Sequence, residues 1–248
     1  MNSLPLASIL TLISSVITTA CAITISKRQK IQLREGILLF KTGETYLVSR
    51  FFVCFIICAT GLFIYGLPGV FVRDLKLVQA SYALGDVIFL IAVAYLISIP
   101  YILFSQNKTA MIVTVRIFLA YAVFYFVYNL ITLKEAMPVH YGSFIDWRSS
   151  INPAVQTVEG LFLVIGLLLF IALFVIKGWK HENSFIRRRS RFFAIGFSIV
   201  LVGWISVFVF LTSETKNISF MLSGGVIGNI FISSGFFIVL RGIIAKDN

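Results

Sequence analysis

Charge is scarce in this sequence. Aspartate, glutamate, lysine and arginine together make up 12% of the 248 residues, about half of their share in a typical soluble domain. Apolar residues take their place, at 59% of the chain and with a mean hydropathy of +0.98. This balance excludes a water-soluble enzyme, a disordered chain and a disulfide-stapled secreted domain, and it indicates an integral membrane protein.

Cysteine and histidine are equally rare. The three cysteines, Cys21, Cys54 and Cys58, all lie inside apolar runs, where a free thiol behaves as a small hydrophobic group. The two histidines, His140 and His181, are separated by a predicted membrane span, so they cannot share a metal ion. We expect no disulfide framework, no metal site and no cofactor.

Motifs of known enzyme and receptor classes are missing as well. The chain contains no His-Glu-x-x-His, no Gly-x-Ser-x-Gly and no phosphate-binding Walker loop. Its last apolar run, Ile218–Leu240, has no lysine that could hold a retinal. The Asp-Arg-Tyr triplet of animal G-protein-coupled receptors does not follow the third run. We therefore expect that the protein is not an enzyme.

Long apolar runs dominate what is present. A helix needs about 20 apolar residues to cross a hydrocarbon core about 30 Å thick, whereas the strands of a membrane barrel alternate over about ten residues. The sequence predicts an all-α integral membrane protein, a seven-transmembrane helical bundle that forms a single domain over residues 1–248. The predicted spans are Leu4–Ile25, Phe51–Val72, Tyr82–Phe104, Met111–Leu133, Ala154–Ile176, Phe192–Leu211 and Ile218–Leu240.

Basic residues are distributed unevenly between the two ends of these spans. Fifteen lysines and arginines flank one side and five flank the other, and Arg116 inside the fourth span completes the 21. Because cytoplasmic loops carry the excess of positive charge, the N-terminus is predicted outside and the C-terminus in the cytoplasm, in a multi-pass protein of the cytoplasmic membrane. Topology and anionic lipid of the inner leaflet then explain the net charge of +11, and we expect no binding to nucleic acid.

Polar residues inside the spans are costly and therefore mark candidate functional positions. Asp86 and Glu159 lie near the outer ends of their spans, about 6–8 Å below the predicted outer boundary. Asn129, Tyr65 and Tyr125 belong to the same outer layer. We predict that these five side chains bind a ligand from outside. The alternative is that the two carboxylates are hydrated by water and bind nothing.

The longest external loop, residues 134–153, is predicted to cover this pocket. Aromatic groups beside a histidine and an acid can close over a ligand, but they can equally belong to the aromatic belt of a membrane–water interface. The sequence leaves both interpretations open. The residues concerned are His140, Tyr141, Phe144, Asp146 and Trp147.

Two further groups of residues have predicted roles at helix surfaces. Gly224 and Gly228, one turn apart and next to Asn229, form a small-residue face for close helix packing. The basic segment at the start of the sixth span either contacts lipid phosphates or docks a cytoplasmic signalling protein. Its arginines are Arg187, Arg188, Arg189 and Arg191.

The segment between the first two spans has two interpretations. Residues 31–40 mix apolar and basic side chains and could form a short helix lying on the inner leaflet. Alternatively, the chain from Glu44 onward is a cytoplasmic extension of the second helix. We favour the extension.

The outside start, the long basic first cytoplasmic loop and the arginine-rich segment Arg187–Gly196 form a layout that resembles a known family. It is similar to the seven-helix sensory region at the N-terminus of bacterial histidine kinases. The resemblance covers most of the chain and is architectural. In those kinases catalytic domains follow the seventh span, whereas this sequence ends at Asn248, so the resemblance implies a sensor that signals through a separate partner.

Taken with the pocket residues, this layout favours one function over two others. We expect a stand-alone seven-helix sensor or receptor-like protein that has an outward-facing polar pocket and signals through a cytoplasmic partner. The first alternative is a small secondary transporter in which Asp86 or Glu159 binds a proton or cation. The second is an accessory or structural subunit of a membrane complex.

Overall fold

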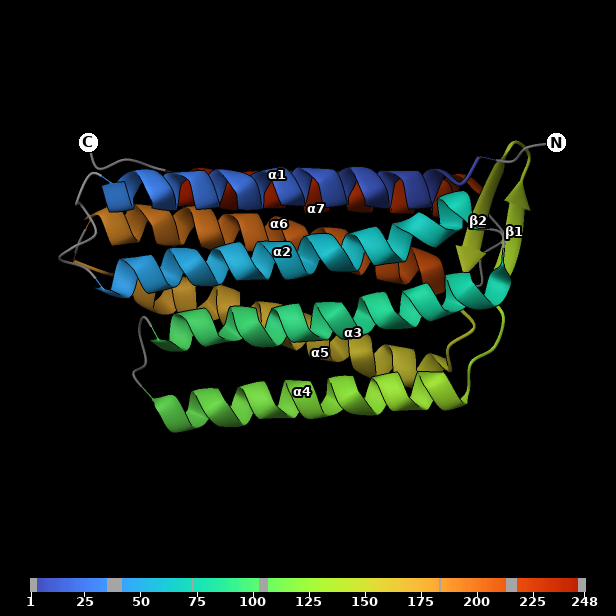
Figure 1. Cartoon of the computed structure of the whole chain (residues 1–248), viewed down its shortest axis with the longest axis horizontal. Helices are drawn as coiled ribbons and strands as arrows, with labels where there is room; N and C mark the ends of the chain where they lie inside the picture. The colour runs from blue at the N-terminus through green and yellow to red at the C-terminus, as the bar shows by residue number, and fades with distance from the viewer. Residues whose placement is uncertain are drawn as a thin grey trace.

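The described part of the chain folds into a bundle of seven long helices, in a computed structural model (Figure 1). The structure describes residues 4–34, 42–72, 74–102, 107–182, 184–212 and 218–244, with side chains except at 28–34, 42–48, 141, 185, 210–212 and 218–224. The helices are α1 (Leu6–Arg34), α2 (Thr42–Phe71), α3 (Leu75–Pro100), α4 (Lys108–Ile131), α5 (Pro153–Leu173), α6 (Ser184–Thr212) and α7 (Ile218–Ile244). All seven contain a segment long and apolar enough to cross a membrane, which confirms the predicted helical membrane bundle.

Helix α3 lies at the centre of the bundle and α4 at its edge (Figure 1). In α3, 78% of the most apolar stretch is buried by protein, against 17% in α4. Helix α3 packs against α2, α4 and α5, while α1 packs against α2 and α7, and α6 against α7. Apart from Lys108, Thr109 and Arg116, the exposed side chains of α4 are apolar, Val123 and Leu130 among them, as expected for a helix that faces lipid on most sides.

Short polar side chains fix where three of the helices begin. Asp74 accepts two backbone N–H bonds in the first turn of α3, at 2.9 and 3.0 Å. Asn107 and Asn152 each accept one, at 3.0 and 2.9 Å, where α4 and α5 begin. Pro153 follows as the first residue of α5, a position where its missing N–H is not needed. These caps fix the residue at which each of the three helices begins.

The segment between α1 and α2 follows the interpretation favoured from the sequence. Helix α1 continues to Arg34 and α2 begins at Thr42, so the chain from Glu44 onward is an extension of α2. Of the apolar residues of the alternative surface helix, Ile31 and Leu33 belong to α1, and Ile37, Leu38 and Phe40 lie outside the described residues.

A β-hairpin between α4 and α5 was not predicted. Strand β1 (Met137–Tyr141) pairs antiparallel with β2 (Phe144–Arg148), and Gly142 in the turn has a φ of 58°, which glycine adopts without steric cost. The hairpin lies at one end of the bundle, beside the beginning of α1 (Figure 1). We call this the hairpin end.

The beginning of the chain is tied to this hairpin through its backbone. The Leu4 N–H donates to the Ser143 carbonyl at 2.8 Å, and the Leu4 carbonyl accepts from the Ile145 N–H at 3.1 Å. Trp147 of β2 is buried, and its indole N–H donates to the Gly69 carbonyl of α2 at 3.0 Å. The hairpin, which lies between α4 and α5 in the chain, therefore contacts the start of α1 and the end of α2 at one end of the bundle.

Phenylalanine rings fill the half of the bundle away from the hairpin. The Phe170 ring lies 4.7 Å from Phe174 and 4.6 Å from Phe197, measured between ring centroids, and Phe51 makes an edge contact with it at 6.4 Å. All four side chains are almost completely buried. This half has an apolar aromatic core, and most of the buried polar side chains lie toward the other half.

Candidate functional site

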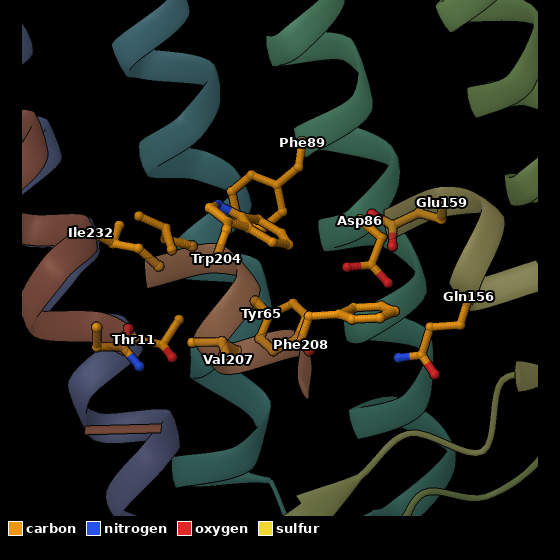
Figure 2. Close-up of a pocket in the computed structure, with 12 residues that line it drawn as sticks. Thr11, Tyr65, Asp86, Phe89, Gln156, Glu159, Trp204, Val207, Phe208 and Ile232 are labelled. Carbon is orange, nitrogen blue, oxygen red and sulfur yellow. The ribbon is translucent and has the colours of Figure 1, made fainter. Parts of the chain in front are cut away.

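A polar cavity of about 60 Å³ lies inside the hairpin half of the bundle (Figure 2). It has space for a few water molecules. Six helices contribute to its lining, and Thr11 and Glu159 lie within about two turns of the start of α1 and α5. The described lining residues are Thr11, Leu62, Tyr65, Asp86, Phe89, Gln156, Glu159, Trp204, Val207, Phe208, Asn229 and Ile232.

Asp86 projects into this cavity from α3 (Figure 2). Its side chain is 7% exposed, and its Oδ2 accepts a hydrogen bond from the Tyr125 hydroxyl of α4 at 2.8 Å. The preceding residue, Gly85, allows the Tyr65 ring to lie against α3, because a Cβ there would stand 2.8 Å from Tyr65 Cδ2. One oxygen of the carboxylate is thus held from behind by Tyr125, and the group faces the cavity.

Glu159 reaches the same cavity from α5, and its carboxyl group lies beside that of Asp86 (Figure 2). The side chain is 2% exposed, and among the described residues its Oε1 has no hydrogen-bond partner. The next residue, Gly160, admits the Phe208 ring of α6, since a Cβ there would stand 2.9 Å from Phe208 Cε2. A buried acceptor without a donor costs free energy, so this oxygen is the least satisfied polar atom of the site.

The five predicted ligand-binding residues divide into two groups. Asp86, Glu159 and Tyr65 line the cavity, and the Tyr65 ring stacks on Tyr82 at 4.4 Å between centroids. Tyr125 and Asn129 are not among the described lining residues. Tyr125 positions Asp86, and the Asn129 amide donates to the Tyr125 carbonyl within α4 at 2.8 Å. The Asn129 amide therefore makes its hydrogen bond within its own helix, and the side chain is not among the described residues that line the cavity.

Sequence reasoning missed most of the cavity wall. Trp204 and Phe208 of α6 look like any aromatic residues of a membrane span, and nothing in a single sequence says which face of α6 they occupy. Phe89 and Trp204 meet edge to face at 5.0 Å between ring centroids. The neighbouring glycines offered a signal, because Gly85-Asp86 and Glu159-Gly160 each place a carboxylate beside a residue that admits a ring.

The hairpin does not form the roof that the sequence suggested. None of its described residues lines the cavity, and Trp147 is buried against α2 instead of lying in an exposed interfacial belt. Burial raises the pKa of the Asp146 carboxyl above its ordinary value, while the Trp147 N–H at 2.9 Å and the Arg148 charge act in the opposite direction. The hairpin is a docked structural element beside the cavity.

The arginines at the start of α6 differ in their contacts. Arg187 donates to the His181 carbonyl at 3.5 Å, and Arg189 donates to the Ile243 carbonyl at the end of α7 at 3.3 Å. Arg188 and Arg191 are exposed. The predicted basic surface is therefore formed chiefly by the side chains of Arg188 and Arg191.

Gly228 lies where α7 crosses α6 closely. A Cβ on Gly228 would stand 2.5 Å from Val207 Cγ2 and 2.9 Å from the Gly203 carbonyl. The same close approach recurs between Gly235 and Gly196, seven residues further along α7 and seven residues earlier in α6. The surroundings of Gly224 lie outside the described side chains.

Asn229 has both a packing contact and a place in the cavity wall. Its Oδ1 accepts from the Ser14 hydroxyl of α1 at 3.3 Å, and its Nδ2 donates to the Gly225 carbonyl at 2.9 Å. It also lines the cavity. The hydrogen bond to α1 joins Asn229 to a neighbouring helix, as is common for amides inside membrane helices.

The described residues contain no group of three or more His, Cys, Asp or Glu side chains that could hold a metal ion. Comparison with known proteins adds no family to this picture. No protein-family model matches the chain, and no curated protein matches it. The site is therefore interpreted from its own chemistry.

Proposed function

We propose that this protein is a receptor-like sensor of the cytoplasmic membrane, which binds a small ligand in the cavity of the hairpin half and signals to a cytoplasmic partner. One observation carries the proposal. Six helices converge on a cavity lined by polar and aromatic side chains, and among the described residues the buried Glu159 Oε1 in it has no hydrogen-bond partner. A convergent polar site with an unsatisfied buried group is typical of a ligand-binding pocket.

The distribution of basic residues supports access from outside. Fifteen of the 21 lysines and arginines flank the helix ends opposite the hairpin, and such an excess favours the cytoplasmic side. In this orientation the hairpin end faces the exterior. The cavity then lies in the outer half of the membrane, where a water-borne ligand has the shorter path.

Helix α6 supports signalling from the cavity to the opposite end. It carries Trp204 and Phe208 in the cavity wall and Arg188 and Arg191 on the exposed surface at its beginning. About 20 Å of continuous helix separates the two groups. Helix α6 packs on α7 through close glycine contacts, so a ligand-dependent shift would move α6 as a rigid unit. This movement would change how these arginines face a partner.

A crosslinked pull-down from native membranes, analysed by mass spectrometry, tests the proposal. We expect a cytoplasmic signalling protein to be enriched with the wild type and lost with the double variant Arg188→Gln/Arg191→Gln. The matched variant Lys76→Gln/Lys134→Gln removes two charges at the hairpin end and should retain the partner. The cavity variant Asp86→Asn/Glu159→Gln should change the amount recovered. Recovery of the chain alone would contradict the proposal.

A transporter is the second candidate, and a second cavity favours it. This cavity, of about 30 Å³, lies deeper in the bundle and shares Leu62, Phe89, Trp204 and Ile232 with the first. The two together continue from the carboxylates toward the phenylalanine core, which would have to open for passage. Cation or proton flux in proteoliposomes that is abolished by Asp86→Asn or Glu159→Gln would favour transport over sensing.

A further inference from the structure

We infer that the cavity takes a small primary or secondary alkylammonium ion, held between the Asp86 and Glu159 carboxylates and enclosed by aromatic rings. This inference rests on the proposed function, because it names the ligand class of the same site. Three properties of the cavity lead to it: its charge, its unsatisfied acceptor and its walls.

The charge of the cavity calls for a cation. Asp86 and Glu159 are 7% and 2% exposed and lie side by side, while none of the twelve described lining residues is basic. The Tyr125 hydroxyl donates to Asp86 but brings no charge. Two neighbouring buried carboxylates without a counter-charge repel each other and lose their hydration. A proton or a bound cation removes both penalties.

The hydrogen bonding of the cavity calls for an N–H donor. Glu159 Oε1 is buried without a partner among the described residues. Thr11 donates to the Ala7 carbonyl at 2.9 Å, and the Asn229 amide donates to the Gly225 carbonyl. Gln156 and Tyr65 also line the cavity, and neither donates to Glu159 Oε1. A primary or secondary ammonium supplies both charge and N–H donors. A quaternary ammonium supplies the charge alone.

The walls of the cavity suit an organic cation better than a metal ion. Tyr65, Phe89, Trp204 and Phe208 line it, and aromatic faces attract ammonium groups by cation–π interaction. The Phe89, Trp204 and Phe208 rings offer no oxygen ligands, whereas Ca²⁺ takes six to eight oxygens and Mg²⁺ six in strict geometry. Gly85 and Gly160 are the positions that let Tyr65 and Phe208 approach the carboxylates, so rings and acids belong to one arrangement.

Binding to the purified full-length protein in lipid nanodiscs tests this assignment. The probe is n-propylammonium chloride, and propan-1-ol is its uncharged match with the same number of non-hydrogen atoms. We expect propylammonium to raise the thermal midpoint in a saturable way and to give a calorimetric binding isotherm. Propan-1-ol and sodium chloride should do neither, and tetramethylammonium should bind at least about tenfold more weakly because it cannot donate to Glu159.

Variants link the binding to these residues. Glu159→Gln should weaken propylammonium binding at least about tenfold, and Phe208→Leu should weaken it about two- to fivefold. Phe231→Leu changes an exposed ring on α7 and serves as the matched control with unchanged affinity. Affinity is measured on variants that retain the wild-type elution profile, so that a folding defect is not counted as lost binding.

Several outcomes would overturn the inference. Equal stabilisation by propan-1-ol or by tetramethylammonium would show that charge or N–H donation is not recognised. Stabilisation by sodium ions or by acid alone, with no effect of propylammonium, would assign the carboxylates to inorganic cations or protons. These results leave the pull-down unaffected. Recovery of the wild-type chain without a partner in that experiment would instead overturn the sensor function while leaving the ligand class standing.

Discussion

Asp86 and Glu159 are each adjacent to a glycine in the sequence, and each glycine admits an aromatic ring. Gly85 lies against Tyr65, and Gly160 lies against Phe208. A methyl group at either position would displace a ring that forms the cavity wall. At the scale of single residues, the site is thus built by placing a glycine next to each acid, so that an aromatic ring from a neighbouring helix can pack there.

Tyr125→Phe should destabilise the bundle more than an ordinary loss of a tyrosine hydroxyl. The Tyr125 hydroxyl donates to the buried Asp86 carboxylate, and hydrogen bonds to charged groups contribute more than neutral ones, so we expect a loss of about 1–2 kcal/mol. Tyr121→Phe is the matched control, because that hydroxyl donates to the uncharged Val155 carbonyl at 3.0 Å. The free energies of unfolding of the two variants are measured in detergent. Equal losses in both would contradict the prediction.

Asp146→Asn should remove a pH dependence of stability. Because burial raises the folded-state pKa of Asp146 above the unfolded value of about 3.9, the folded state binds this proton more tightly. The contribution to stability is complete below the unfolded pKa and is lost as the pH rises through the folded pKa. The wild type should therefore lose thermal stability as the pH rises above about 4.

Thermal midpoints measured from acid to neutral pH check this expectation. The Asn variant should show a flatter profile, and Glu135→Gln, which alters an exposed acid in the same segment, should keep the wild-type slope. An Asn variant with an unchanged profile would show that Asp146 is not the titrating group.

Part of this detail is visible in the sequence. Asp86 and Glu159 could be singled out because a carboxylate inside an apolar run is expensive and rare. Asn129 was chosen by the same logic and lies outside the cavity wall, since an amide can satisfy itself on its own helix. Trp204 and Thr11 could not be identified, because their place in the wall depends on how α1 and α6 are rotated in the bundle.

Helix α7 and helix α6 approach most closely at four glycines, and this defines a prediction at the scale of the element. Gly228→Ala places a methyl group 2.5 Å from Val207 Cγ2 and close to the Gly203 backbone. The helices must separate, at a cost of about 1–3 kcal/mol. Gly225→Ala lies almost one turn away on the same helix, meets no atom of the described residues within 4 Å and should be neutral or stabilising by up to about 1 kcal/mol.

Unfolding of both variants in the same detergent compares the two positions directly. If Gly225→Ala were as destabilising as Gly228→Ala, helix propensity instead of helix contact would be the dominant effect.

The sequence predicted the helices better than it predicted their ends and contacts. Apolar runs of the right length are enough to recognise seven spans, whereas the hairpin was missed because its two strands of five residues are shorter than the spans around them. A signal was present, since aromatic and β-branched residues flank the Gly142-Ser143 turn. The pairing of α1 with α7 has no local signal, because it joins Ser14 to residues more than 200 positions away.

At the scale of the whole molecule, membrane orientation can be tested directly. We expect a cysteine placed at Ser143, in the hairpin turn, to react with a membrane-impermeant maleimide in intact cells. A cysteine at Glu182, before α6, should react only after permeabilisation. Cys21 and Cys54 are buried, and replacing Cys58 with serine provides a quiet background. Labelling of both positions from the same side would contradict the seven-span arrangement.

The hydrogen bonds of Ser14 with Asn229 and Ser233 have a consequence for how the protein is made. Helix α1 leaves the ribosome before α7, against which it packs, and Ser14 and Asn229 are 215 residues apart. At about 5–20 residues per second, α1 is in the membrane for roughly 10–40 s before α7 arrives. During that interval the Ser14 hydroxyl has no partner from α7, so closing the bundle between α1 and α7 is a late event of biogenesis.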